Sequence, residues 1–271
     1  MPELPEVEVT RRGIAAHIEG RSITKVVIRR HDLRWPVPKE LPAILPGLRV
    51  KTVSRRAKYL LLDCEQGWLI LHLGMSGSLR IIPAGTAAKK HDHFDLEFGG
   101  EHLMRLHDPR RFGAVLWTRT APEQHELMAH LGPEPFSPEV TGKWLHGQLR
   151  GRTAPIKNLL MDSRILVGVG NIYANEALFR CGIRPSLGGG KLVIARCGQL
   201  VETVRATLSS AIEAGGSTLR DFVNTDGSAG YFQQSYFVYD RHGEPCRVCG
   251  APVKLARISQ RSTFYCPRCQ R

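Results

Sequence analysis

The sequence predicts an α+β protein of two domains, with a β-rich N-terminal half, a helical second half and a cysteine-rich hairpin at the end of the chain. Three observations lead to this prediction. Short apolar segments separated by Gly turns continue to about residue 119, which is typical of a β-sandwich or a barrel. Apolar residues then recur four apart from residue 200, as in an amphipathic helix. Two Cys-x-x-Cys pairs lie near the C-terminus.

The first segment, residues 2–20, is predicted to be a helix. Its apolar residues fall on one helical face, and Gly20 suits the C-terminal cap. The residues on this face are Leu4, Val7, Ile14 and Ile18.

The segment after this helix is predicted to form paired strands. Residues 60–62 and 69–71 are apolar runs on either side of a Gln66-Gly67 turn, which indicates a hairpin with a well-buried face. Residues 93–98 alternate polar and apolar side chains. This alternation predicts a half-buried strand.

Three prolines within residues 133–138 mark the predicted boundary between the domains. The predicted division gives an N-terminal domain over residues 1–132 and a linker over 133–139. A helical domain over 140–236 and a cysteine hairpin over 237–271 follow.

The helical part contains a glycine turn that is a candidate anion site. Helices are predicted near residues 155–162 and 171–181, with Gly168 and Gly170 in the turn between them. Asn171 is a good cap for the helix that it opens, and free amides at a helix start bind anions. A loop whose glycines only permit a sharp turn is the alternative, and locally it is the commoner case.

The composition favours a polyanionic partner. The formal net charge is +13 and the sequence pI is about 9.8, which favours nucleic acid first and an anionic membrane surface second. No apolar run reaches the ~18 residues of a spanning helix, and the N-terminus lacks the regions of a signal peptide. We therefore expect a cytoplasmic protein.

The two cysteine pairs, Cys246/Cys249 and Cys266/Cys269, have the spacing of a closed tetrahedral zinc site. Such a site is structural and performs no chemistry. Basic residues surround it, so the hairpin presents positive charge to a phosphate backbone. Two disulfides, or a zinc ribbon without a ligand, are the alternatives; the spacing and the absent signal peptide favour zinc over disulfides. The other cysteines, Cys64, Cys181 and Cys197, are expected to be buried free thiols.

Pro2 is a candidate nucleophile. Removal of Met1 leaves a secondary amine that can attack an electrophilic carbon and form an iminium, and a helix start should lower the pKa of that amine. Glu3 and Glu6 lie within one turn and could move protons. The alternative is strong, because Pro and Glu are what any helix start prefers, and these residues alone favour it.

Two basic segments shift this balance. Arg55 and Arg56 next to Lys58 should lower the pKa of the lysine, although a basic strand facing phosphate is the alternative. In residues 108–113 an aromatic ring, Phe112, follows arginines on a turn. This combination suits entry into a base stack, and a core Phe capped by a cation is the alternative.

These motifs, taken in order, resemble those of the bacterial formamidopyrimidine-DNA glycosylase (Fpg, or MutM) family, and the resemblance runs from end to end. The matching segments are residues 1–6 (MPELPE), 55–60 (RRAKYL), 72–77 (HLGMSG), 90–93 (KHDH), 108–113 (DPRRFG), 168–173 (GVGNIY) and the cysteine quartet. The resemblance implies an N-terminal helix on a two-layer β-sandwich. A helical domain with a helix–two-turn–helix motif and a C-terminal zinc-finger β-hairpin would follow.

The resemblance also implies an activity. The protein would be a bifunctional DNA glycosylase and AP lyase of base excision repair that excises 8-oxoguanine and formamidopyrimidines and then cuts the strand by β,δ-elimination. It would need one structural zinc ion and no organic cofactor. Its partner would be damaged double-stranded DNA, and it would act as a monomer, nucleoid-associated through DNA binding, in a bacterial cytoplasm.

Roles carry over residue by residue from the family. Pro2 would attack the anomeric carbon, Glu3 would protonate the sugar oxygen, and Glu6 would support both. Lys58 would donate a proton in β-elimination, and Arg261 would grip phosphate and assist δ-elimination. The residues that would fill the space of the everted base are Met75, Arg110 and Phe112, with Arg110 facing the orphaned cytosine. The remaining DNA contacts would be His72, His91, Arg152, Lys157 and Asn171. The loop over residues 217–231 would close over the base.

Two other readings stay open at this point. An endonuclease VIII-like enzyme of the same superfamily would prefer oxidised pyrimidines, whereas Leu4-Pro5 and the Met75/Arg110/Phe112 set resemble the purine-directed branch. A non-catalytic DNA-binding protein of the same fold is the other alternative, and the intact Pro2, Glu3 and Lys58 argue against it.

Overall fold

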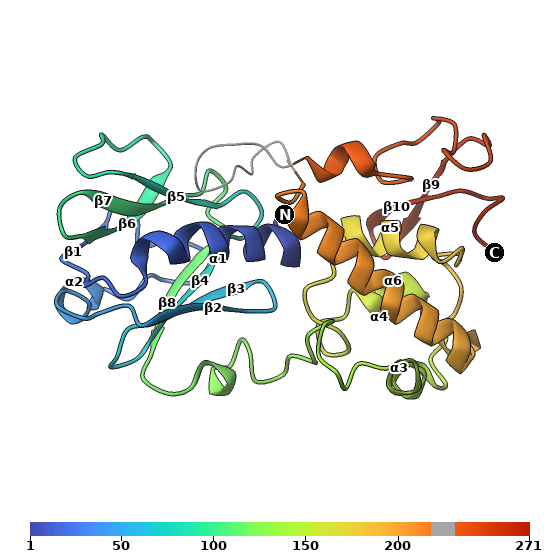
Figure 1. Cartoon of the computed structure of the whole chain (residues 1–271), viewed down its shortest axis with the longest axis horizontal. Coiled ribbons are helices and arrows are strands. Elements are labelled where there is room, and N and C mark those ends of the chain that lie inside the picture. The colour runs from blue at the N-terminus through green and yellow to red at the C-terminus, as the bar shows by residue number, and fades with distance from the viewer. Residues whose placement is uncertain (218–230) are drawn as a thin grey trace. The chain divides into compact units, whose positions relative to one another are not determined.

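The computed structural model describes residues 1–217 and 231–271, and the described chain forms two compact units (Figure 1). The first contains Met1–Ala129 and, from later in the chain, Ala214–Ser217 and Tyr231. The second contains His130–Glu213 and Phe232–Arg271. The helical segment and the cysteine hairpin therefore pack as one unit, and the boundaries at residues 132, 139 and 236 remain predictions.

The described part of the first unit holds one long helix and two four-stranded antiparallel sheets. One sheet has the order β1-β6-β7-β5, with β1 at Lys25–Ile28, β6 at Asp92–Phe98, β7 at His102–His107 and β5 at Ser78–Pro83. The other has the order β2-β3-β4-β8, with β2 at Thr52–Arg56, β3 at Tyr59–Asp63, β4 at Trp68–His72 and β8 at Ala114–Thr118. Short helices follow β1 and β8, α2 at Leu41–Ile44 and η1 at Pro122–Gln124.

The helix α1, Leu4–Ile18, packs against an edge strand of each sheet, β2 and β5, as well as β3 (Figure 1). Its buried face carries the four predicted apolar residues, of which Val7, Ile14 and Ile18 join the core between the sheets. Gly20 adopts φ +77°, the left-handed conformation that ends a helix. The predicted N-terminal helix and the hairpin of β3 and β4 are confirmed.

The strand predicted over residues 93–98 is confirmed as β6, but the prediction that it is half-buried is wrong. His93 is only 5% and Asp95 only 1% exposed, so both faces of β6 are covered. Arg105 of β7 donates to both oxygens of Asp95, at 2.9 and 2.8 Å, and a His93 ring nitrogen lies 2.9 Å from the Asp108 carbonyl oxygen. Polar side chains can be buried when hydrogen bonds replace those to water. The alternating residues of β6 therefore form one apolar face and one polar face, and both faces are buried.

The second unit contains a helical group and a two-stranded sheet. Its elements are α3 at Gly142–Leu149, α4 at Ile156–Leu160, α5 at Asn171–Arg180, η2 at Gly189–Lys191, α6 at Ile194–Glu213, η3 at Phe232–Ser235, β9 at Lys254–Ile258 and β10 at Arg261–Tyr265. The helices predicted near residues 155–162 and 171–181 and over 200–212 are confirmed as α4, α5 and part of α6.

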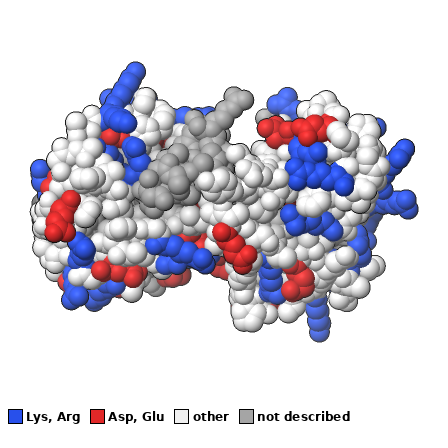
Figure 2. Space-filling view, turned by 45° about the horizontal axis from the view of Figure 1, so that its top comes forward, with Lys and Arg blue, Asp and Glu red and all other residues white. Residues whose placement is uncertain are grey.

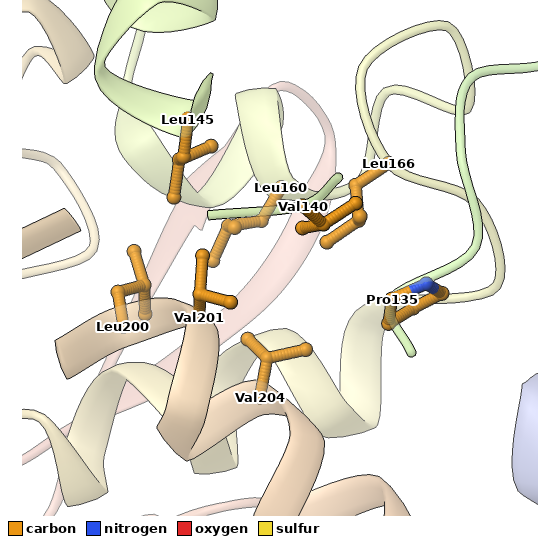
Figure 3. Close-up of a pocket in the computed structure, with 8 residues that line it drawn as sticks. All are labelled: Pro135, Val140, Leu145, Leu160, Leu166, Leu200, Val201 and Val204. Atoms are coloured by element: carbon orange, nitrogen blue, oxygen red, sulfur yellow. The ribbon is translucent and has the colours of Figure 1, made fainter. Parts of the chain in front are cut away.

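The helices of the second unit meet at an apolar seam, shown in Figure 3. Its lining side chains come from α3, α4, α6 and the segments next to them: Pro135, Val140, Leu145, Leu160, Leu166, Leu200, Val201 and Val204. The space between them does not admit a water molecule. We therefore interpret the seam as packed core and not as a ligand site.

A buried carboxylate attaches the chain before the cysteine hairpin to α5. Glu176 is 0% exposed, and it accepts the backbone N–H groups of Phe237, Val238 and Tyr239 at about 3.0 Å. An apolar cluster that includes Phe179, Val238 and Phe264 surrounds this contact. The hairpin therefore docks onto α5 through both polar and apolar contacts.

None of the described helices is both long enough and apolar enough to cross a bilayer.

We expect Glu176→Ala to lower the stability of the protein strongly. The buried Val238 N–H and the part-buried N–H groups of Phe237 and Tyr239 would lose their acceptor. Each such loss in the interior costs about 1–3 kcal/mol, so we expect a total of about 3 kcal/mol. Urea unfolding of the zinc-loaded protein measures this. Glu202→Ala is the control, because Glu202 on α6 is 71% exposed in its ion pair with Arg205. Equal losses in the two variants would contradict the anchoring role of Glu176.

Candidate functional site

Two buried acidic residues, Glu3 and Glu6, lie at the start of α1. Pro2 is buried, and Glu3 and Glu6 are 3% and 0% exposed. The Glu6 carboxylate accepts the backbone N–H of Glu3 at 2.8 Å through one oxygen. Its other oxygen accepts the backbone N–H of Ser217, also at 2.8 Å. Glu6 thus fixes the helix start and the chain at Ser217 to each other.

The amino terminus lies in this group and has an altered basicity. Burial lowers the pKa of the α-amino group of Met1, and nearby Lys58 and Arg110 lower it further, while Glu3 and Glu6 oppose this change. Removal of Met1 would make Pro2 the terminal amine, one residue closer to Glu3. The structure therefore brings together five of the predicted site residues: Pro2, Glu3, Glu6, Lys58 and Arg110.

Lys58 lies in a two-residue turn between β2 and β3, closed by the pair Arg56 and Tyr59. Ala57 in this turn has φ +53°, an uncommon conformation for a residue other than Gly. Arg55 donates to the Ala57 carbonyl at 2.7 Å and pairs with Glu8 of α1 at 3.3 Å. Arg55 therefore connects the Lys58 turn to α1, which begins two residues after the candidate nucleophile Pro2. The predicted lowering of the Lys58 pKa stays a prediction.

Two neighbouring loops hold the candidate wedge residues. The fully buried Asp108 accepts the Ser76 hydroxyl at 2.9 Å and the Gly113 N–H at 2.7 Å, and Ser76 accepts the Arg110 N–H at 3.2 Å. At Gly74 a Cβ would lie only 2.3 Å from the Phe112 carbonyl carbon, so the loops approach too closely for a side chain there. These contacts fix the two loops to each other.

The wedge side chains themselves point outward from these loops. Met75 and Phe112 are 38% and 39% exposed. The Arg110 guanidinium carbon lies 5.0 Å from the centre of the Phe112 ring, within range of a cation–π contact. A core position for Phe112 is therefore wrong, and the three predicted wedge residues lie on two loops that contact each other.

His72 precedes the loop that carries Met75, and its imidazole ring is neutral with the N–H donor at Nε2. Its Nδ1 accepts the Gly74 N–H at 2.9 Å, so the proton of the neutral ring is on Nε2. Burial, with Lys58 and Arg34 as lesser causes, lowers the pKa of the half-buried His72 to about 4. The ring therefore stays uncharged at neutral pH.

The second unit holds the remaining predicted residues. Asn171 begins α5 and donates to the Ser262 carbonyl at 3.1 Å. Arg261 is exposed at the start of β10, one residue before that carbonyl, and Arg152 is exposed before α4. Asn171 thus lies next to the strand that carries Arg261.

Lys157 has a different environment from the one that a DNA contact requires. It is 0% exposed, and its ammonium donates to the Ser262 carbonyl at 2.8 Å and to the Thr263 hydroxyl at 2.7 Å. A direct contact with DNA would require this ammonium to leave its buried position. In this structure Lys157 holds β10 in place behind Arg261.

The four C-terminal cysteines fit a zinc ion. Their sulfur atoms all lie within 4.8 Å of one another; Cys249 and Cys266 are 3.4 Å apart, and Cys246 and Cys269 are 3.9 Å apart. Four sulfurs on a tetrahedral zinc, each at about 2.3 Å, lie about 3.8 Å from one another. The ion would stabilise the hairpin and leave no open position for chemistry. The other three cysteines are buried and free, as expected.

Comparisons with known proteins identify the family. The formamidopyrimidine-DNA glycosylase N-terminal domain matches residues 1–115, and the H2TH domain of the same enzymes matches residues 131–223. The zinc finger found in FPG and IleRS matches residues 243–271. The chain belongs to the formamidopyrimidine-DNA glycosylase family.

Relatives match this family member over its full length. The formamidopyrimidine-DNA glycosylase of Methylococcus capsulatus is 57% identical over 271 residues, and the match covers 100% of both chains. The Lactococcus lactis Fpg in complex with DNA containing an abasic site has a TM-score of 0.91 at 31% identity, with 99% of each chain covered. MutM in complex with DNA containing carbocyclic 8-oxo-G has a TM-score of 0.91 at 32% identity, with 100% of each chain covered. The resemblance, the fold class and the zinc site predicted from the sequence are confirmed.

Some residues that build the site were not predicted. Glu8, Asp108 and Ser76 have no predicted role, although the buried Asp108 opens a motif that the sequence displays. Ser217 was predicted only as the first residue of the loop over 217–231, and its contact with Glu6 carries no sequence signal because it is made by a backbone N–H. Residues 218–230 of the loop predicted to close over the base lie outside the described residues.

We expect one zinc ion per chain, and Cys249→Ser to lose it together with the ordered hairpin. Elemental analysis and thermal unfolding measure the two quantities. Cys197→Ser is the control, because this buried thiol lies outside the cluster and should keep the metal. Full zinc content and unchanged stability in Cys249→Ser would contradict the four-sulfur site.

His72 should make the protein less stable at acid pH. Because its folded pKa is about 4 and its unfolded value about 6.5, the stability it contributes is present above about pH 6.5 and is lost as the pH falls towards 4. We expect His72→Gln to flatten this dependence. Melting temperatures from pH 7 to pH 4.5 measure it, with the exposed His17→Gln as control. Parallel curves for all three proteins would contradict the prediction.

Proposed function

We propose that this protein is a bifunctional DNA glycosylase and AP lyase of base excision repair that acts on oxidised purines in duplex DNA. The observation that carries this proposal is the partly buried amino terminus among Glu3, Glu6, Lys58 and Arg110. A terminal amine with a lowered pKa, two carboxyl groups and a lysine are the groups that imine chemistry needs. The names of the relatives support 8-oxoguanine and formamidopyrimidines as substrates.

In the proposed reaction the Pro2 nitrogen attacks the anomeric carbon of the damaged nucleotide. The bond from that carbon to the base breaks, and the base leaves with its electron pair and takes up a proton. Glu3 protonates the sugar ring oxygen, the ring opens, and the amine becomes an iminium that joins protein and sugar. Glu6, held by the N–H groups of Glu3 and Ser217, keeps the helix start in place during these steps.

Strand cleavage follows from the iminium. Loss of a proton next to the iminium carbon expels the 3′ phosphate, and a second elimination expels the 5′ phosphate. Lys58 is proposed as the proton donor in the first elimination, and Arg261 as the phosphate ligand that assists the second. Hydrolysis of the remaining imine restores the Pro2 amine.

Base eversion is the second part of the proposal. An enzyme cannot reach the anomeric carbon of a stacked nucleotide, so the base has to leave the stack at a cost of a few kcal/mol. Insertion of Met75, Arg110 and Phe112 into the vacated space would offset part of this cost. The exposure of Met75 and Phe112 on loops fixed by Asp108 supports this role.

The remaining contacts are proposed to hold the DNA backbone. His72, His91, Arg152 and Asn171 would bind phosphates, and basic side chains are widespread over the face shown in Figure 2. Lys157 would act behind Arg261 through the contacts described above. The net charge of +13 predicts a steep dependence of DNA affinity on salt. We further propose that the protein acts as a monomer in the bacterial cytoplasm, at the nucleoid.

The trapping of a covalent intermediate tests this function. The protein is incubated with a duplex that carries 8-oxoguanine opposite cytosine, borohydride is added, and a denaturing gel shows any covalent adduct. We expect an adduct whose peptide map places the DNA on Pro2. Adduct formation on thymine glycol alone would favour a pyrimidine-directed enzyme, and DNA binding without any adduct would favour a non-catalytic protein.

We expect Pro2→Gly to lose most base excision and trapping, at least about 100-fold, because the secondary amine is replaced by a primary amine with less restricted geometry. Binding to the same duplex should remain within about threefold, because Pro2 contributes no charge beyond the terminal amine. Single-turnover excision and gel-shift titration measure the two effects. Wild-type excision rates in this variant would refute Pro2 as the nucleophile.

A further inference from the structure

The first unit has a basic cavity that none of the proposed catalytic steps uses. Its volume is about 450 Å³, and its walls come from three segments: the end of β1, the start of β6 and the loop before β8. The lining residues are Arg29, Arg30, Lys89, Lys90, His91, Asp92, His93, Pro109 and Arg111. We call it the β1–β6 cavity. Its size is that of a ligand site and not of a packing defect.

The walls of this cavity are fixed by backbone hydrogen bonds. The Arg29 N–H donates to the His93 carbonyl at 2.8 Å, and the Asp108 N–H donates to the His91 carbonyl at 2.9 Å. The Asp92 carboxylate accepts the Lys89 N–H at 2.8 Å, which closes the turn that presents the two lysines. The cavity is therefore preformed, and a ligand would not have to order these segments.

Its acidic groups are already engaged by other cations. Asp92 lies 2.7 Å from a His107 ring nitrogen and 3.3 Å from Arg80. Asp95, which does not line the cavity, pairs with the lining residue Arg29 at 2.6 Å and with Arg105 at 2.8 Å. Neither carboxylate is left to neutralise the cations at the cavity mouth.

The cations at the cavity mouth have fewer carboxylate partners than they have positive charges. Arg30 and Arg111 share one carboxylate, Asp32, at 2.9 and 2.7 Å, and this group is 65% exposed and therefore well screened. Lys89 and Lys90 are exposed, and neither makes an ion pair with any described residue. The mouth thus has an excess of positive charge, which calls for an anionic ligand.

The neighbours of the cavity indicate which anion it takes. His91 in its wall is proposed to bind the DNA backbone. Pro109 and Arg111 flank Arg110, whose guanidinium lies over Phe112 while Arg111, with φ +57°, pairs with Asp32 at the mouth. Of these two successive arginines, Arg110 thus lies with the candidate wedge residue Phe112 and Arg111 lines the cavity. Since a DNA strand carries a phosphate every ~3.4 Å along its axis, a strand at the wedge brings further phosphates close by.

We propose that the β1–β6 cavity is an additional phosphate site for the DNA backbone. Lys89 and Lys90, with Arg30 and Arg111, bind phosphate oxygens outside the contact that His91 makes. This site extends the grip on the duplex without taking part in base excision. The inference rests on the proposed function, because its ligand is DNA.

The experiment measures DNA affinity of the full, zinc-loaded protein as a function of salt. The duplex carries a tetrahydrofuran abasic-site analogue opposite cytosine, which cannot lose a base. The test variant is Lys89→Ala/Lys90→Ala. The control is Lys39→Ala/Lys51→Ala, which removes the same charge from exposed positions of the first unit outside the cavity. Melting curves show that each variant is folded.

We expect the slope of log affinity against log salt to fall by about 1–2 in the test variant, since each lost phosphate contact contributes about 0.9. Affinity at low salt should fall about tenfold, and the control should keep the wild-type slope. A methylphosphonate scan of the duplex locates the contact. One neutralised phosphate should weaken the wild type and have no effect on the test variant.

A wild-type slope in the test variant, or an equal fall in test and control variants, would overturn the inference while the proposed function stands. Inorganic phosphate is the other possible source of the anion. If 10 mM phosphate stabilised the wild type but not the test variant, and the DNA slope stayed unchanged, the cavity would be a site for the free ion. Wild-type protein without affinity for this duplex would overturn the proposed function itself.

Discussion

The candidate active site depends on the burial of one charged group, the Glu6 carboxylate. A carboxylate taken out of water is costly unless hydrogen bonds replace its solvation, and the start of α1 supplies both an N–H group and a favourable dipole. The second N–H comes from Ser217, on a segment far away in the sequence. At Gly216, with φ +80°, a side chain would crowd Glu6. The two hydrogen bonds of Glu6 therefore hold the start of α1, two residues after Pro2, and the chain at Ser217 together.

The second unit applies the same principle to the zinc hairpin. The cysteines hold the hairpin together internally, but they do not determine where it lies on the helices. Three buried polar side chains do: Glu176 accepts the backbone before the hairpin, Lys157 donates to β10, and Asn175 accepts the Phe264 N–H at 2.9 Å. Because β10 begins with Arg261, these contacts also determine where that guanidinium is presented. The cysteine cluster thus holds the hairpin together, and the buried polar side chains fix its position on the helices.

The arginines of this protein divide into structural and surface groups, so the net charge overstates what is available to DNA. Arg105 is buried between Asp92 and Asp95, and Arg205 donates to the carbonyls of Pro135, Ser137 and Val140. The charge of such groups is offset by the carboxylates and carbonyl oxygens that they contact, so it is not available to DNA. The charge that a polyanion meets comes from exposed cations without strong partners, such as those at the mouth of the β1–β6 cavity.

The sequence by itself determined the fold class and the zinc cysteines, and the first of these rests on the order of its motifs along the whole chain. Pro2 as the nucleophile stays a prediction, which the resemblance to the family suggests and the local pattern alone does not. Cys-x-x-Cys spacing places two sulfurs on one ion, and the apolar spacing of α1 needs only residues of the same segment. The tertiary structure decided what depends on contacts between distant segments. The alternation of polar and apolar residues predicted that His93 and Asp95 are exposed to solvent. In the fold Arg105 on the next strand donates to Asp95, and a His93 ring nitrogen lies within hydrogen-bond distance of the Asp108 carbonyl oxygen. The positive charge of Lys157 is compatible with a DNA contact, yet in the fold its ammonium is buried and donates hydrogen bonds to β10. A sequence shows which groups are polar, and only the fold decides whether water or the protein satisfies them.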